Sequence, residues 1–375
     1  MKQGWEIKKL GEVCDVVGGS TPKTNEESYW GGEHYWISPA ELDGSKYIYS
    51  TSRTITDDGV RSAHLQMLPI GTVLLSSRAP IGKVAITKVP MYCNQGFKNL
   101  VCKNEVINEY VYWFLAHSTD YLNSLGTGAT FKEISKKVVE QVSIPVPPLP
   151  EQEKIVSELD CLSGIIEKKR QQLKELDTLA QSIFYEMFGN PVENEKEWDT
   201  YVLKDVSTLL NGRAYKQNEL LSEGKYKVLR VGNFFTNGSY YYSDLELDED
   251  KYCDNGDLLF AWSASFGAFI WNGEKVIYHY HIWKVLYDEQ FLDIQYYRFL
   301  LNTMTNYFMK DVHGIGMVHL TKAGMEEYVL PIPPLPLQQS FAQKIESIEM
   351  QKELIKQSIA EVETLFNSRM DYYFN

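Results

Sequence analysis

Arginine, lysine, glutamine, asparagine, serine and threonine recur in glycine-containing stretches of both halves of the chain. Examples are SSRAPIGK at 76–83, NQGFKN at 94–99, GTGATFKEISKK at 126–137 and LRVGNFFTNGSYYY at 229–242. These side chains suit hydrogen bonding to base edges and to phosphates. Glycan or protein recognition would use the same residue types. The composition of these stretches therefore predicts a recognition surface and leaves its ligand open.

Motifs for catalysis are missing from the sequence. There is no GxxxxGK[ST] phosphate loop, no HExxH and no GxSxG. An N6-adenine methyltransferase motif is also lacking, since the paired prolines are followed by leucine. His279 and His281 form an isolated pair that suits a recognition surface better than a metal site. The scattered cysteines form no CxxC pair, which argues against a zinc site or a disulfide framework. We expect no catalytic residue, metal or cofactor on this chain.

Composition describes a folded but acidic protein. With 375 residues and 44% hydrophobic residues, the chain suits two domains with additional elements. Its first residues lack the apolar run of a signal peptide. No stretch approaches the roughly 18 apolar residues of a membrane span, so we expect a cytoplasmic protein. The net charge of −13 argues against a protein that binds DNA without a partner, because DNA phosphates require cations. Either DNA is not the partner, or basic residues are local and a partner subunit supplies more.

An internal repeat covers most of the chain. GWEIKKLGEV at the start resembles EWDTYVLKDV from Glu197, and PIGTVLLSSRAPIGKVAI resembles DNGDLLFAWSASFGAFIW. NQGFKNLV likewise aligns with HYHIWKVL, and an aromatic helix pattern follows in both halves. Each half ends in a proline segment, IPVPPLP from Ile144 and LPIPPLP from Leu330. The repeat predicts two similar globular domains.

The proline segments predict stiff, extended connections into long helices. Proline fixes φ, lacks an N–H donor and suits the first turn of a helix, where Pro150 and Pro336 lie. Gly189, followed by Pro191, predicts the end of the first helix in a left-handed cap. Each helix has room for about 36 residues, or roughly 54 Å.

Apolar residues in both helices follow heptad spacing, which predicts that the two stripes cover each other in a coiled coil. Lys169 and Lys352 interrupt the two stripes. An alternative is that each helix packs only on its own globular domain. The predicted interface residues are Ile155, Leu159, Leu162, Ile166, Leu173, Leu176, Ile183, Phe341, Ile345, Ile348, Ile355, Ile359, Val362 and Phe366.

Two variable domains, each followed by a PxPPLP box and a long helix, resemble the specificity subunit of type I restriction–modification enzymes. The residues that carry the resemblance are WEIKKLGEV at 5–13, IPVPPLPEQEKIVSELD at 144–160 and LPIPPLPLQQ at 330–339. NQGFKNL at 94–100 and GATFKEIS at 128–135 add to it. The second copy departs from the pattern, since LPLQQ replaces the acidic LPEQE and HYHIWKVL lacks Gln-Gly-Phe-Lys.

This resemblance implies an α+β fold with two mixed α/β target-recognition domains in a pseudo-twofold arrangement, separated by a long antiparallel two-helix coiled coil. The expected domains are residues 1–150 and 190–336, and the spacer helices are residues 151–189 and 337–375. Each domain would read one half of a bipartite double-stranded DNA target. Methyltransferase subunits, two in number, and restriction subunits would be partners in a bacterial or archaeal cytoplasm. S-adenosylmethionine, ATP and magnesium would belong to those partners. A coiled-coil adaptor of a defence complex that recognises another protein is the alternative.

Side-chain chemistry selects the candidate DNA contacts. Arginine and glutamine can pair bidentately with guanine and adenine, while lysine and threonine mostly hold phosphates. In the first domain the candidates are Lys23, Arg78, Lys83, Gln95, Lys98, Thr130 and Lys132. In the second they are Arg213, Lys216, Arg230, Asn233, Ser263, His281, Lys284 and His319.

Overall fold

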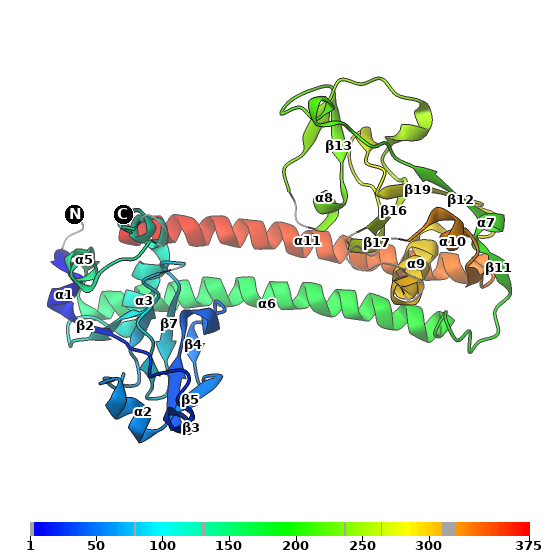
Figure 1. Cartoon of the computed structure of the whole chain (residues 1–375). Coiled ribbons are helices and arrows are strands. Elements are labelled where there is room, and N and C mark those ends of the chain that lie inside the picture. Colours follow the sequence, from blue (N-terminus) through cyan, green and yellow to red (C-terminus); the bar gives the residue numbers. More distant parts are fainter. Residues whose placement is uncertain (1–3, 79, 129–131, 236–237, 264, 310–319) are drawn as a thin grey trace. The chain divides into compact units, whose positions relative to one another are not determined.

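The computed structural model describes residues 4–78, 80–128, 132–235, 238–263, 265–309 and 320–375 (Figure 1). The chain forms two compact units, Met1–Arg170 with Gln357–Asn375, and Gln171–Lys356. Each unit contains helices, β-sheets and a hydrophobic core of its own, which confirms the predicted mixed fold class. Among the described helices, none combines the length and the apolar character that a membrane span requires.

The first unit contains a strand pair and two sheets. β1 (Glu6–Lys9) pairs antiparallel with β10 (Ser143–Val146), and the sheets have the orders β2-β9-β6-β7-β4 and β5-β3-β8. Their strands are β2 (Cys14–Gly18), β3 (Trp30–Ile37), β4 (Tyr47–Ile48), β5 (Arg53–Ile55), β6 (Val73–Leu75), β7 (Val84–Thr87), β8 (Tyr92–Cys93) and β9 (Lys98–Cys102). The helices are α1 (Leu10–Val13), α2 (Asp57–Ser62), α3 (Asn108–His117), α4 (Thr119–Ser124) and α5 (Lys136–Gln141), with 3-10 turns at Glu27–Tyr29 and Pro39–Glu41.

The second unit repeats this plan. β11 (Thr200–Val202) pairs antiparallel with β20 (Val329–Pro331), and the sheets have the orders β12-β19-β16-β17 and β14-β13-β18-β15. Their strands are β12 (Ser207–Asn211), β13 (Tyr226–Leu229), β14 (Tyr241–Ser243), β15 (Tyr252–Cys253), β16 (Leu258–Ser263), β17 (Ser265–Ile270), β18 (Val276–Tyr278) and β19 (Ile282–Tyr287). The helices are α7 (Leu203–Val206), α8 (Val231–Phe235), α9 (Ile294–Phe308) and α10 (Lys322–Glu326), with 3-10 turns at Gln217–Glu219 and Glu249–Lys251.

Strand order and direction agree between the units. The order β2-β9-β6-β7 corresponds to β12-β19-β16-β17. The other sheet of each unit contains a parallel pair, β3 with β8 and β13 with β18, in which Trp36 lies opposite Tyr92 and Val228 lies opposite Ile277. The repeat found in the sequence is therefore a repeat of topology, with β4 and β15 as additions at the sheet edges.

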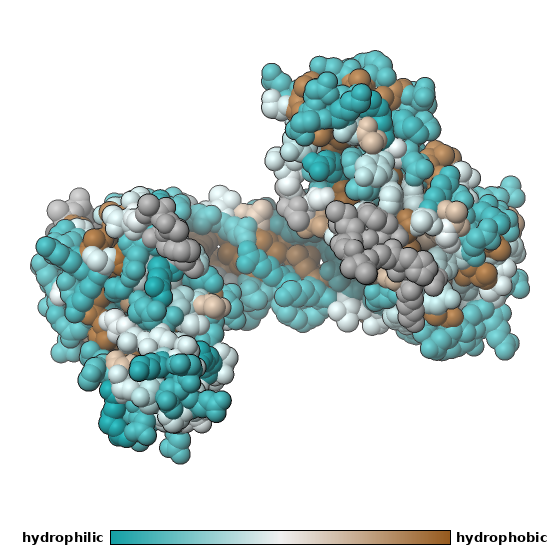
Figure 2. Space-filling model, in the orientation of Figure 1, coloured by the Kyte–Doolittle hydropathy of each residue, from teal (hydrophilic) through white to brown (hydrophobic). Residues whose placement is uncertain are grey.

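The two long helices, α6 (Leu149–Phe188) and α11 (Leu335–Phe374), are shared between the units. In the first unit, Arg369 bonds Glu158 at 2.5 and 2.9 Å, and Arg170 approaches Glu363 at 2.6 Å. These pairs place the start of α6 antiparallel to the end of α11. In the second unit, Lys352 bonds Asp177 at 2.7 Å. In the view of Figure 2, hydrophilic residues cover most of the visible surface, and hydrophobic residues gather along the long helices.

Helix residues at the ends of the heptad stripes also complete the domain cores. Ile155 and Leu159 of α6 and Phe374 of α11 belong to the first core, where the Phe374 ring lies 5.4 Å from the Tyr110 ring. Phe184, Phe341 and Ile345 belong to the second core. Packing on the globular domains therefore accompanies pairing of the helices, and the long helices are consistent with the predicted coiled coil. The individual interface residues stay a prediction.

Proline shapes the entry to both helices. Pro145 and Pro331 lie in β10 and β20, each of which pairs with one strand only, so the missing N–H breaks no central ladder. The helices then begin at Leu149 and Leu335. The predicted left-handed cap is confirmed, because Gly189 directly after α6 has φ of 75°.

Candidate functional site

In the first unit, the loops that follow β2, β6 and β8 contact one another. The Ser20 N–H donates to the Cys93 carbonyl at 3.0 Å, and the Ser77 N–H donates to the Gly96 carbonyl at 2.8 Å. The Thr21 hydroxyl bonds the Gln95 side chain. Because β2, β6 and β8 deliver these loops to one place, the predicted residues Lys23, Arg78 and Gln95 are brought into one region.

A glycine at the same place in each unit allows these loops to dock. A Cβ on Gly19 would lie 2.1 Å from the Cys93 carbonyl oxygen, and one on Gly212 would lie 2.4 Å from the Tyr278 carbonyl oxygen. A side chain would push either loop away from the strand that it contacts. Glycine therefore fixes the loop after β2 and the loop after β12 in the same way.

Two tryptophans hold the loop after β2 from its other side. The Trp36 indole N–H donates to the Ser20 carbonyl at 3.2 Å, and the Trp30 indole N–H donates to the Lys23 carbonyl at 3.1 Å. The exposed guanidinium of Arg53 lies over the Trp30 ring, 3.6 Å from its centre. The sequence did not indicate the role of the two tryptophans, because their hydrogen-bond partners are backbone atoms.

The predicted first-unit residues differ in how free their side chains are. Lys23, Gln95 and Lys132 are exposed, and Arg78 is half-buried with no ion pair to another described residue. The Lys83 ammonium donates to the Leu42 carbonyl at 2.7 Å.

Lys98, also predicted, bonds Glu133 at 3.2 Å, and only 14% of its side chain is exposed. Lys83 and Lys98 thus stabilise the loops. Thr130 lies outside the described residues.

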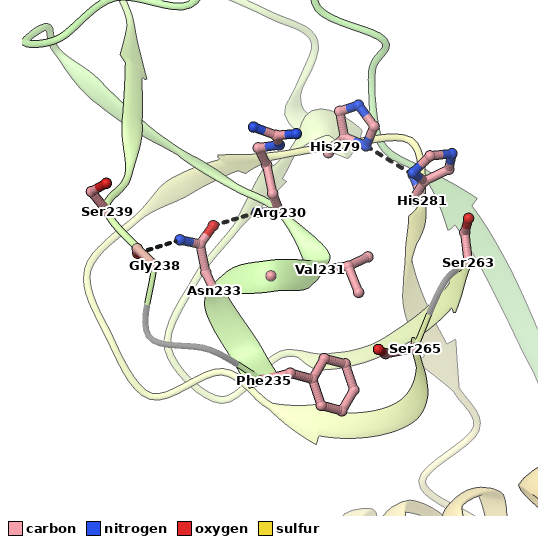
Figure 3. A pocket seen from close by; sticks show the side chains of 11 residues that line it. Arg230, Val231, Asn233, Phe235, Gly238, Ser239, Ser263, Ser265, His279 and His281 are labelled. Carbon is pink, nitrogen blue, oxygen red and sulfur yellow. Dashed lines mark hydrogen bonds between the residues drawn. The ribbon is translucent and has the colours of Figure 1, made fainter. Parts of the chain in front are cut away.

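In the second unit the segments after β13, β16 and β18 enclose a concavity of about 470 Å³ (Figure 3). No aspartate or glutamate is among its described lining residues, although the chain has 50 acidic and 37 basic residues. The lining residues are Arg230, Val231, Gly232, Asn233, Phe235, Gly238, Ser239, Ser263, Ser265, His279 and His281. The concavity therefore combines hydrogen-bonding and apolar groups, and its described lining carries no carboxylate in an acidic protein.

Asn233 positions Arg230 at the rim of the concavity. The Asn233 side-chain oxygen accepts from the Arg230 N–H at 2.8 Å, and its amide donates to the Gly238 carbonyl at 2.9 Å. Arg230 itself is exposed, and its guanidinium carbon lies 5.2 Å from the centre of the Tyr241 ring. Asn233 therefore stabilises the loop, and the Arg230 guanidinium provides hydrogen-bond donors at the rim.

The two histidines of the concavity are not equivalent. The Nδ1 of His279 accepts from the His281 N–H at 3.4 Å. Burial lowers the pKa of His279 to about 4, and the nearby His281 and Arg230 act in the same direction. His279 is thus neutral at physiological pH, with its remaining proton on Nε2. The sequence predicted a recognition surface for both histidines, but only His281 was among the candidate DNA contacts.

A neighbouring concavity of about 640 Å³ shares His281. Trp262 lines it and stacks on Trp283, with ring centres 5.4 Å apart and planes 18° apart. Asn211, Thr321 and Lys322 add polar groups, and here too the described lining residues include no carboxylate. Together the two concavities combine aromatic rings with hydrogen-bond donors, which are the groups that contact nucleic acid bases.

The remaining predicted residues of the second unit are mostly engaged within the protein. Arg213 bonds Glu219 through two hydrogen bonds, at 2.8 and 2.9 Å, which lower the pKa of Glu219 to about 2. The Lys284 ammonium lies 2.6 Å from Asp257.

Lys216 is exposed, and Ser263 lines the concavity but is 2% exposed. His319 lies outside the described residues. Within the described part of the chain, no group of three or more His, Cys, Asp or Glu side chains could hold a metal ion.

Comparisons with known proteins place this arrangement in a family. The family described as "Type I restriction modification DNA specificity domain" matches residues 2–177 and 195–364. The MjaIX type I restriction enzyme specificity subunit of Methanocaldococcus jannaschii is 31% identical over 367 residues, which cover 90% of this chain and 85% of that subunit.

Two solved structures share the fold. The type I restriction–modification S subunit from M. genitalium has a TM-score of 0.57 at 13% identity, over 99% of this chain and 96% of its own. A chain from a study of complex assembly and conformational transition of the type I R-M system has a TM-score of 0.63 at 18% identity, over 100% and 98%. The sequence relative is a specificity subunit, and the two solved structures, both from type I systems, share the fold of this chain.

Proposed function

This chain belongs to the type I restriction modification DNA specificity family, and from that premise we propose that each of its two units reads one half of a bipartite DNA target. Sequence-specific recognition of DNA for a restriction–modification system is the function of this chain, and it is a non-catalytic subunit. The proposal concerns how the recognition is divided and which residues perform it.

The concavity of the second unit, whose described lining carries no carboxylate, is the observation that supports this proposal most directly. DNA phosphates repel carboxylates, and base edges require donors and acceptors at fixed positions. Arg230 at its rim can donate two hydrogen bonds to guanine. The neutral imidazole of His279 can donate one from Nε2 without adding charge. A chain with a net charge of −13 presents such a surface only where acidic residues are kept away.

The proposed contact residues are side chains that are exposed, that line the concavity, or that have no ion pair to another described residue. In the first unit we propose Lys23, Arg78, Gln95 and Lys132; in the second, Lys216, Arg230, His279 and His281. Lys83, Lys98, Arg213, Asn233 and Lys284 hold the loops through the bonds described above. Recognition domains at 1–150 and 190–336, with spacer helices at 151–189 and 337–375, complete the proposed division.

Partner subunits supply the chemistry in this proposal. Two methyltransferase subunits bind S-adenosylmethionine, and restriction subunits use ATP and magnesium, in a bacterial or archaeal cytoplasm. Apolar side chains available for docking occur on α11, where Met350 and Leu354 are each 65% exposed. Both line a concavity of about 790 Å³ together with Trp271 and Arg298.

Mapping of methylated adenines tests the proposed function. The chain is co-expressed with the methyltransferase subunit encoded with it in a host that lacks other adenine methylation, and the DNA is sequenced by a method that detects methyladenine. We expect one motif of two short specific halves separated by a fixed gap. Cells with the methyltransferase subunit alone are the control and should show no motif. An uninterrupted motif, or none, would contradict the proposal.

A further inference from the structure

Each proline segment is followed by a fully buried glutamine whose amide makes three hydrogen bonds to the backbone. The Gln152 Nε2 donates to the Pro147 carbonyl at 2.8 Å and to the Glu105 carbonyl at 2.9 Å. Its Oε1 accepts from the Ile107 N–H at 3.0 Å. The side chain thus joins the start of α6 to the segment that leads into α3.

Gln338 repeats this arrangement in the second unit. Its Nε2 donates to the Pro333 carbonyl at 2.7 Å and to the Phe291 carbonyl at 2.8 Å. Its Oε1 accepts from the N–H of Asp293, the residue that caps α9, at 2.9 Å. Both glutamines are 0% exposed. The same three bonds at equivalent positions show that the arrangement belongs to the repeated unit.

A buried tyrosine fixes the proline segment in both units. The Tyr110 hydroxyl donates to the Pro145 carbonyl at 2.7 Å, and the Tyr296 hydroxyl donates to the Pro331 carbonyl at 2.8 Å. Gln152 and Tyr110 together hold the segment at both of its ends, as Gln338 and Tyr296 do in the second unit. The prolines make each segment stiff, and the hydrogen bonds of the glutamine and the tyrosine fix the direction in which the segment runs.

We propose that Gln152 and Gln338 are positioning residues that set the direction in which each long helix leaves its domain, and thereby the number of base pairs between the two DNA halves. The proposal rests on the proposed function, since it requires a bipartite target. An amide with three buried partners has one orientation that satisfies all of them. The start of each helix is therefore held in one direction relative to α3 or α9.

The length of the helices makes that direction decisive. From Leu149 to Arg170, α6 extends roughly 33 Å at 1.5 Å per residue. A change of about 10° at its start would displace this end by roughly 6 Å, which exceeds the 3.4 Å step of one base pair. Small losses of alignment therefore change the preferred gap before they change base recognition.

Gap-length profiles test this role. DNA targets with identical halves and gaps changed by one or two base pairs are methylated by the whole complex with wild type, Q152M or Q338M. Methionine keeps the length and removes the hydrogen bonds. We expect discrimination against gaps that differ by one base pair to fall about tenfold, while the bases preferred in each half stay unchanged. Gln339, which is exposed beside Gln338, provides Q339M as a control that should match wild type.

The outcomes separate this role from support of the fold alone. A loss of methylation that is equal at every gap, or an unchanged profile, would overturn the proposal. Y110F and Y296F remove one hydrogen bond each and keep the ring, and they should relax the gap in the same direction. These two variants decide the question if Q152M or Q338M does not fold. Failure of the proposed function would differ, because wild type would then show no bipartite motif.

Discussion

Arg78 offers the sharpest test of base reading by a single side chain. It lies half-buried in the turn after β6, beside Gly96, and its guanidinium has no ion pair among the described residues. If it contacts a guanine, Arg78→Ala should weaken binding by roughly 1–3 kcal/mol for that base and little for other bases at that position. This loss is measured by the binding of the assembled complex to targets that carry single base changes.

Arg61 is the matched control for Arg78. It lies on α2 of the same unit, 70% exposed, and pairs with Asp58. Arg61→Ala should leave the base preferences unchanged. An Arg78→Ala complex that keeps the wild-type preference at every position would remove Arg78 from the proposed contacts.

His279 should make stability depend on pH in a defined range. Its pKa is about 4 in the folded protein against an ordinary value of 6.5, because burial, His281 and Arg230 disfavour the charged form. The unfolded chain therefore binds a proton first, and the stability contribution is lost as pH falls from about 6.5 to about 4. Thermal unfolding of wild type and His279→Gln between pH 4 and 7 should show a shallower fall for the variant. Parallel curves would contradict this assignment.

Residue type alone predicted cations near the recognition loops but not which of them are free. Lys98 and Lys284 are neutralised by Glu133 and Asp257, which lie far away in the sequence. Arg213 faces Glu219, six positions away, in a two-bond pair that local pattern could suggest but not establish. His279 was not among the candidate contacts, because its neutral state depends on burial that residue type does not reveal. Residue types in the sequence indicate a recognition surface, whereas the folded structure determines which side chains are available on it.

Among the elements, α11 carries a partly buried charge network where the heptad pattern is interrupted. Lys352 contacts Asp177 and Glu349, and Glu349 also approaches Arg298 of α9 at 3.4 Å. Burial lowers the pKa of Arg298, and Glu349 opposes that shift. The lysine that interrupts the apolar stripe is thus used to link α6, α11 and the second domain.

Glu349→Gln should destabilise the second unit. It leaves Arg298, whose side chain is 22% exposed, without the Glu349 carboxylate, and removing the partner of a partly buried charged group costs about 1–3 kcal/mol. Glu353→Gln, one turn later, breaks the exposed pair with Lys356 and should cost at most about 1 kcal/mol. Urea unfolding of both variants measures the free energy of unfolding that each substitution removes. Equal costs would show that the Arg298 contact is unimportant.

Element boundaries were largely predictable, since proline and glycine act through local backbone geometry. The predicted helix from 151 to 189 compares with α6 from Leu149 to Phe188, followed by Gly189. Tertiary partners were not predictable. Gln152 and Gln338 stood in the quoted boxes, but their bonds to Glu105 and Phe291 depend on chain segments about 47 residues away.

At the scale of the whole molecule, the acidic charge limits how the chain holds DNA. With a net charge of −13, binding relies on local cations and on partner subunits. If Lys23 and Lys216 contact phosphates, replacing each with alanine should reduce the slope of log affinity against log salt by about 1 for the complex. Base preferences should not change.

Lys204 provides the control for these salt measurements. It lies in α7 and pairs with Glu327 at 2.7 Å. Lys204→Ala should leave the slope unchanged. A slope that Lys23→Ala and Lys216→Ala also leave unchanged would place DNA elsewhere on the two units.

The repeat and the two-unit plan could be predicted because each half carries its own strands, aromatic helix and proline box. The residues with which the long helices complete each core could not be predicted. Met370, Tyr373 and Phe374, at the end of the chain, pack in the first core, while Phe184 and Phe188 pack in the second. No local pattern assigns the end of α11 to the first domain, which is distant in sequence.

Domain-specific change of the methylated motif tests the central claim most directly. Complexes with Arg78→Ala and with Arg230→Ala are expressed separately, and methylated adenines are mapped across the genome. We predict that Arg78→Ala relaxes one half of the motif and Arg230→Ala relaxes only the other, with the gap unchanged in both. A variant that alters both halves together, or two variants that alter the same half, would contradict division of recognition between the two units.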